Sequence, residues 1–190
     1  MAGMTTSPPA VRPAAEADLR ALNEIYNHYI RTSHSTFDLE EHDLAWRRAW
    51  LVERSSPVHR VLVAERDDRV VGYASSGPHR PRGAYRTTVE TSVYVAPAET
   101  GTGVGTALYR ALFDALDRTD LHRALAGITL PNDASIALHL AFGFGLVGRF
   151  TEQGNKFGRF WDVEWYERPM QSRGADRGAV AGAEALHDPV

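Results

Sequence analysis

The stretch TVETSVYVAP at residues 88–97, followed by GTGVG at residues 101–105, decides the fold of this chain. Its first part is rich in β-branched and hydroxyl side chains, which is typical of a strand, and a helix with apolar periodicity follows the glycines. A strand, a glycine turn and a helix in this order aim backbone N–H groups at a point where the helix dipole also favours negative charge. The pattern predicts a phosphate-binding turn. A ligand-free flexible loop is the alternative, and the flanking strand and helix argue against it.

The residues that the glycine turn lacks limit which phosphate-containing ligands it can bind. A kinase or ATPase loop needs G-x-x-x-x-G-K-[ST], and the only lysine of the chain is Lys156. A dinucleotide fingerprint needs G-x-G-x-x-G, whereas these glycines stand at alternate positions, 101, 103 and 105. The turn therefore indicates a pyrophosphate held mainly by backbone amides.

The composition predicts a soluble, cytoplasmic protein of one domain. The chain has 190 residues, 43% of them hydrophobic and 24% charged, which suits a globular core. A formal net charge of −3 disfavours nucleic acid as a partner, and no apolar stretch is long enough for a membrane span. The eight histidines lack metal-ligand spacing, so we expect no metal site. The absence of cysteine excludes a thiol nucleophile and fits a reducing compartment.

The periodicities along the chain predict an α/β (α+β) fold with the order β-α-α-β-β-β-α-β-α-β-β. The expected domain covers residues 10–170, between a flexible N-terminus at residues 1–9 and a disordered tail at residues 171–190. One helix connects the strands at about 86–95 and 123–130, so these two strands should be parallel. We expect the other strands near residue 11 and at about 61–65, 70–76, 146–151 and 157–167, and the other helices at about 16–31, 40–54 and 133–142.

Several separate motifs in this order resemble one family. They are Asn27-His28-Tyr29-Ile30, Thr36-Phe37, Gly77-Pro78, Tyr85, residues 88–95, Pro131-Asn132-Asp133-Ala134-Ser135, His139 and Lys156-Phe157-Gly158. The chain thereby resembles the GCN5-related N-acetyltransferases (GNAT), and within them the phosphinothricin and methionine sulfone/sulfoximine N-acetyltransferases. The resemblance implies a mixed central sheet of about seven strands flanked by about four helices, acetyl-CoA as co-substrate, and a homodimer.

The resemblance also implies where acetyl-CoA binds. In the family, the fourth and fifth strands diverge after a bulge, and the pantetheine arm fills the gap while the pyrophosphate lies on the glycine turn. The family pattern at this turn is Gln/Arg-x-x-Gly-x-Gly, and Thr100 stands at its first position here. The cofactor-binding residues implied are Val93, Tyr94, Val95, Gly101, Thr102, Gly103, Val104, Gly105, Thr106, Asn132 and Ser135.

Acetyl transfer to an amine requires a base, because only the unprotonated amine attacks a thioester. Glu90 is the candidate, since it is a carboxylate in an otherwise apolar and hydroxyl strand, where burial would raise its pKa. The resemblance supports this role. It also implies that His139 either donates a proton to the departing thiolate or orients CoA.

The acceptor pocket is expected around the loop at residues 77–85. Arg80 and Arg82 suit a carboxylate or phosphinate, so a small anionic amino acid is the natural acceptor. Phe37 and Tyr85 would wall the pocket, and the resemblance places the turn that contains Lys156 near the site and the dimer interface.

These observations favour an acetyl-CoA-dependent N-acetyltransferase of a small amino acid analogue, by direct attack in a ternary complex. Acetylation of another amine, such as a peptide N-terminus or a polyamine, is the alternative within the enzymes, although two arginines disfavour a polyamine. A non-catalytic acetyl-CoA sensor is the other alternative. A sensor needs neither Glu90 nor His139 at the thioester.

Overall fold

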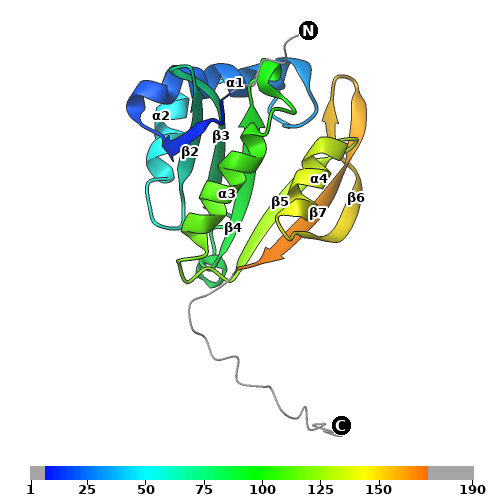
Figure 1. The fold of residues 1–190 in the computed structure, drawn as a ribbon. Coiled ribbons are helices and arrows are strands. Elements are labelled where there is room, and N and C mark those ends of the chain that lie inside the picture. The colour runs from blue at the N-terminus through cyan, green and yellow to red at the C-terminus, as the bar shows by residue number, and fades with distance from the viewer. Residues whose placement is uncertain (1–6, 171–190) are drawn as a thin grey trace, which may run out of the picture.

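The computed structural model describes residues 7–170, and their strands form one mixed sheet (Figure 1). Within these residues the sheet has seven strands in the order β1-β2-β3-β4-β5-β7-β6, with four α-helices around it. The expected element order and fold class are confirmed. The expected loose ends, residues 1–9 and 171–190, lie outside the described residues except for 7–9. The strands are β1 Ala10–Pro13, β2 Val61–Arg66, β3 Arg69–Pro78, β4 Thr88–Val95, β5 Arg123–Thr129, β6 Gly145–Lys156 and β7 Arg159–Pro169, and the helices are α1 Leu19–Thr32, α2 Leu44–Glu53, α3 Val104–Leu116 and α4 Asp133–Ala141.

Local chemistry sets several of these boundaries. The helix expected from residue 40 begins instead at Leu44, because the Asp43 side chain accepts a hydrogen bond from the Trp46 amide at 2.8 Å and caps it. Asp67 and Asp68 both have positive φ, 50° and 58°, as a two-residue turn between antiparallel strands requires. The strand expected from residue 86 begins at Thr88, after a short 3₁₀ turn at Gly83–Tyr85.

Alternate residues of the central strands face two helical layers. Leu62 and Ala64 belong to a core with α3, whose Leu108 and Leu112 are fully buried, and α4 covers the same face. Val61 and Val63 face the other layer, formed by α1 and α2. The central strands are therefore covered on both faces, and a functional hollow has to lie where strands or helices separate. Among residues 7–170 no helix is both long and apolar enough to cross a membrane.

Candidate active site

The parallel strands β4 and β5 separate in the middle of the sheet. They pair only from Thr88↔Arg123 to Glu90↔Leu125, and beyond Glu90 they diverge. The divergence expected from the resemblance is confirmed. The bulge is not found in the β3–β4 pairing, whose register runs without a shift from Gly72↔Val95 to Pro78↔Val89.

The divergence leaves one set of β4 backbone groups facing the gap. The carbonyl of Thr87 accepts bonds from the start of β5, so the odd-numbered residues of β4 direct their amides and carbonyls toward β5. Beyond the last pair these residues are Thr91, Val93 and Val95, and the Tyr29 hydroxyl donates to the Val95 carbonyl at 2.7 Å. The gap can accept an extended ligand that pairs with β4 as a strand would.

A cleft of about 840 Å³ follows this gap from β4 to the glycine turn and α4. Two predicted cofactor residues do not line it: Val104 is buried in the core, and the Thr102 hydroxyl donates to the Glu99 carbonyl at 2.8 Å. Residues that sequence reasoning missed line its α1 side, among them His28 and Thr32. The predicted residues that do line it are Val93, Tyr94, Val95, Gly101, Gly103, Gly105, Thr106, Asn132, Ser135 and His139.

The glycine turn presents backbone donors to this cleft. Gly101 and Gly103 have φ of 79° and 85°, a left-handed conformation that favours glycine, and Gly103 caps α3. The first intrahelical bond is donated by the Ala107 amide, so the amides of the preceding turn of α3 remain free at the positive end of the helix dipole. Behind the turn, the buried Arg66 forms an ion pair with Glu99 and fixes the turn to the end of β2. The turn therefore fits a pyrophosphate through its backbone.

Glu90 lies on the α1/α2 side of β4 and forms a pair with His79. The His79 Nδ1 and Glu90 Oε1 atoms are 2.6 Å apart. The Glu90 side chain is 40% exposed and that of His79 is 13% exposed, so the burial expected for the base is wrong. The exposure arises because Glu90 is the last paired residue before the strands diverge. His79 was missed as a partner because hydrogen bonding between a loop histidine and a strand carboxylate has no local sequence signal.

His139 is buried and held as the neutral imidazole. Its Nδ1 lies 2.7 Å from the Ser135 carbonyl oxygen, which can only accept, so Nδ1 carries the proton. The Nε2 atom then accepts from the Tyr109 hydroxyl at 2.8 Å. Burial lowers the pKa of His139, in agreement with this state. Both ring nitrogens are engaged, and this arrangement favours an orienting role over direct proton donation.

A second, smaller cavity of about 190 Å³ lies between α1, α2 and the strands β3 and β4. Glu90, Ser92 and Tyr94 line it from β4, and the last two also line the large cleft. Arg47 of α2 and Arg54, which directly follows this helix, line it as well, among aromatic side chains. The cavity and the cleft thus meet along the segment of β4 that follows Glu90.

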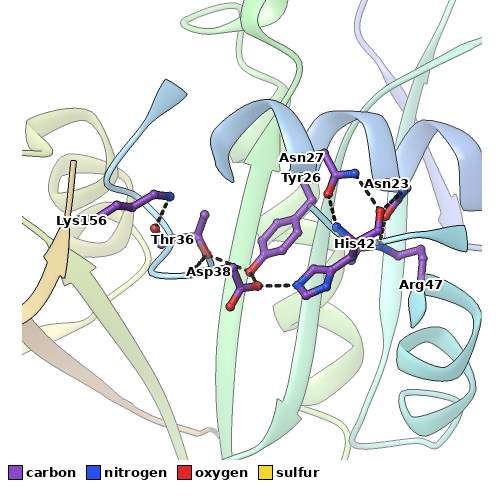
Figure 2. Close-up of polar contacts among 8 residues, drawn as sticks. All are labelled: Asn23, Tyr26, Asn27, Thr36, Asp38, His42, Arg47 and Lys156. Atoms are coloured by element: carbon purple, nitrogen blue, oxygen red, sulfur yellow. Dashed lines mark hydrogen bonds and ion pairs between the residues drawn. The ribbon is translucent and has the colours of Figure 1, made fainter. Parts of the chain in front are cut away.

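The loop between α1 and α2 is fixed beside this cavity by a polar network (Figure 2). The Tyr26 hydroxyl donates to Asp38 at 2.7 Å, and His42 contacts the same carboxylate at 2.8 Å. On the other side of the loop, the buried Lys156 donates to the Thr36 carbonyl at 2.8 Å, and burial lowers its pKa. Lys156 therefore supports the loop from β6 and lines neither hollow.

The other predicted acceptor residues also lie outside both hollows. Arg80 and Arg82 are exposed on the loop between β3 and β4. Tyr85 is 38% exposed and lies edge-on to His79, with ring centroids 5.5 Å apart. Phe37 packs against Gly154 of β6. The structure does not bring these four residues together around one acceptor pocket.

The chain was compared with known proteins. The model of the GNAT acetyltransferase domain matches residues 11–165. A phosphinothricin N-acetyltransferase of Streptomyces coelicolor is 51% identical over 163 residues, which cover 84% of this chain and 95% of that protein. An L-methionine sulfoximine/L-methionine sulfone acetyltransferase of Salmonella typhimurium is 38% identical over 165 residues, 87% and 96% of the two chains. The crystal structure of a GNAT phosphinothricin acetyltransferase from Sinorhizobium meliloti in complex with acetyl-CoA matches with a TM-score of 0.83, 32% identity and coverage of 86% and 89%.

Proposed function

Since the chain belongs to the GNAT family of N-acetyltransferases, we propose that it transfers the acetyl group of acetyl-CoA to the amino group of a small amino acid analogue. The substrates that the names of its relatives state, phosphinothricin and methionine sulfoximine or sulfone, are the acceptors we propose for this chain. The observation that carries the proposal is the position of Glu90 in the small cavity, directly before the segment of β4 along which that cavity meets the cleft.

The cleft has the shape and the chemistry for acetyl-CoA. The backbone groups of Val93 and the amide of Val95 face the gap and suit the polar groups of pantetheine, and the amides at the start of α3 suit the pyrophosphate. Asn132 caps α4 by accepting from the Ser135 amide at 3.2 Å, and both residues border the cleft. When bound, acetyl-CoA supplies an activated thioester.

The chain's own residues would then serve direct attack in a ternary complex. Glu90 accepts a proton from the acceptor ammonium, directly or through a water, and His79 holds the carboxylate in place. As the amine forms its bond to the acetyl carbon, the amide near Val95 stabilises the negative oxygen. The carbon–sulfur bond then breaks, and CoA leaves as a thiolate that takes up the proton that the nitrogen loses. His139 keeps the neighbouring end of the cleft in place through Ser135 and Tyr109.

The exposed residues of the loop after His79 have a supporting part in this proposal. Arg80 and Arg82 attract an anionic acceptor toward the cavity, and Tyr85 frames the His79–Glu90 pair. Phe37 and Lys156 act through the loop between α1 and α2. The reaction is proposed to take place in the cytoplasm.

We further propose that the protein is a homodimer through the outer face of the β6–β7 hairpin. Large apolar side chains that are more than half exposed gather there, and in Figure 1 this hairpin forms the edge of the sheet. Exposed apolar clusters of this kind mark interaction surfaces. The side chains are Leu146, Val147, Phe150, Phe157 and Phe160.

Thiol release from acetyl-CoA, measured over a panel of amines, tests the activity and the acceptor together. We expect turnover with phosphinothricin, methionine sulfone and methionine sulfoximine, and little with spermidine or a peptide N-terminus. Acetyl-CoA binding without turnover on any amine would instead favour the sensor, and a preference for spermidine would contradict the proposed acceptor class.

A further inference from the structure

Arg47 is a buried cation with an unused hydrogen-bond donor. It lies in the first turn of α2 and is 1% exposed. Its Nη2 atom has no hydrogen-bond partner among residues 7–170, and its Nε atom makes only a long 3.5 Å contact with Asn23 (Figure 2). A buried guanidinium without an anion is costly, so the arrangement calls for a negatively charged partner.

Aromatic side chains surround this guanidinium, and among them only the Tyr73 hydroxyl interacts with it as a polar group, without a negative charge. The Arg47 Cζ atom lies 4.7 Å from the centroids of both Tyr26 and Trp50 and 4.9 Å from that of Trp46. Such contacts stabilise the positive charge, but ring faces cannot replace the oxygen atoms that an arginine fork prefers. The donor therefore remains available to a ligand that enters the cavity.

The cavity that Arg47 lines has the size and charge distribution for a small amino acid. Its volume of about 190 Å³ corresponds to roughly six water molecules at about 30 Å³ each. Arg47 of α2 and Arg54 just after it line the cavity, and Glu90 is its only lining carboxylate among the described residues. The two arginines can pair with the acid group of an amino acid, and the Glu90 carboxylate can pair with its amino group. Asp38 and its partner His42 are not among the lining residues.

We propose that Arg47 binds the acid group of the acceptor amino acid inside this cavity, so that the amino group faces Glu90 on β4. This assignment rests on the proposed function and names the residue that selects an acid-bearing acceptor. It moves the anion-binding role from the exposed Arg80 and Arg82 to a residue that the fold has already desolvated.

The test compares methionine sulfone with its carboxamide, which lacks only the negative charge. Each is titrated by calorimetry into protein saturated with CoA, which cannot turn over, and each is assayed for thiol release with acetyl-CoA. Arg47→Met should weaken binding of methionine sulfone about 30-fold or more, because a desolvated charge pair is lost, and change binding of the carboxamide by less than about threefold. Arg47→Lys should recover part of the difference. Arg48→Met, which removes the neighbouring exposed charge of α2, is the matched control, and its loss should stay below about threefold. Arg82→Met tests the exposed loop as the rival binding site for the acid group.

The outcomes separate this inference from the proposed function. No thiol release with any amine would reject the proposed function, while the titration with CoA would still decide the role of Arg47. Equal affinity of Arg47→Met and wild type for methionine sulfone would overturn the inference, as would loss of the acid preference in Arg82→Met. If Arg47→Met fails to fold, Ser75→Leu fills the same cavity and keeps the arginine. This variant should lose methionine sulfone binding and keep acetyl-CoA binding, and unchanged methionine sulfone binding would overturn the inference.

Discussion

Replacing Glu90 by glutamine removes the proposed base while keeping its size and its place beside His79. A general base contributes about 10²–10⁴-fold to a rate, so kcat at neutral pH should fall by that factor. The factor corresponds to about 2.7–5.5 kcal/mol of lost transition-state stabilisation. Raising the pH should restore part of the rate, because more of the amine is then unprotonated before it binds.

The structure predicts that this loss is separate from any loss of stability. The Glu90 side chain is 40% exposed, and ion pairs with this much solvent contribute about 0–1 kcal/mol. For a protein of this size, 1 kcal/mol shifts Tm by about 2–4 °C, so the Tm of Glu90→Gln should lie within about 4 °C of the wild type. Acetyl-CoA binding should also be unchanged, since the cofactor contacts are proposed for the odd-numbered residues of β4.

Thiol release at pH 7 and pH 9, with methionine sulfone as acceptor, measures the effect. Glu24→Gln, which removes an exposed carboxylate from α1, is the matched control and should retain the wild-type kcat. A Glu90→Gln enzyme whose kcat at pH 7 lies within about threefold of the wild type would refute the assignment of the base.

Four further predictions concern the cofactor, the acid stability and the assembly. Acetyl-CoA at about 100 times its Kd should stabilise the protein by about 2.7 kcal/mol in thermal unfolding, and NAD and ATP much less; an unchanged Tm would contradict the cofactor site. Gly105→Leu should abolish this stabilisation, because even a Cβ there would lie 3.2 Å from Leu138, and an unchanged shift would show that the cleft is not the site. Burial lowers the pKa of His139, so the unfolded chain binds a proton near pH 6.5 before the native protein does. Stability should therefore fall as the pH drops below about 6.5, by at most about 1.4 kcal/mol per pH unit for this group, and urea midpoints of His139→Gln should fall less steeply. Phe160→Asp should convert a dimer into a monomer in light scattering, and a monomeric wild type would contradict the proposed dimer.

Local patterns in the sequence predicted most of the fold. The element order, the parallel pair of β4 and β5 and the turn at Gly101–Gly105 follow from periodicity and from glycine positions, which are local properties. The start of α2 was missed because the capping side chain of Asp43 outweighs the apolar pattern that precedes it.

The candidate site was predicted mainly where its parts come from one segment. Most of the residues that the family resemblance implies for the cofactor line the cleft, because the strand, turn and helix that contribute them are consecutive, while Asn132 and Ser135 come from the start of α4. The burial of Arg47 could not be predicted, since in the sequence Trp46-Arg47-Arg48 it looks like a residue on an exposed helix face, and only tertiary packing buries it. The same limitation explains why the contact of Glu90 with His79 was missed. The acceptor-binding roles of Arg80 and Arg82 stay predictions.

The cofactor cleft and the small cavity share only a short part of β4, and this separation has a practical consequence for protein engineering. Among residues 7–170, only Ser92 and Tyr94 line both hollows, and no residue of α2 lines the cofactor cleft. A combinatorial library at Trp46, Arg47 and Trp50 would therefore vary the acceptor while leaving the cofactor cleft untouched. Variants could then be selected for activity on new acyl acceptors, while acetyl-CoA remains the acyl donor in an unchanged cleft.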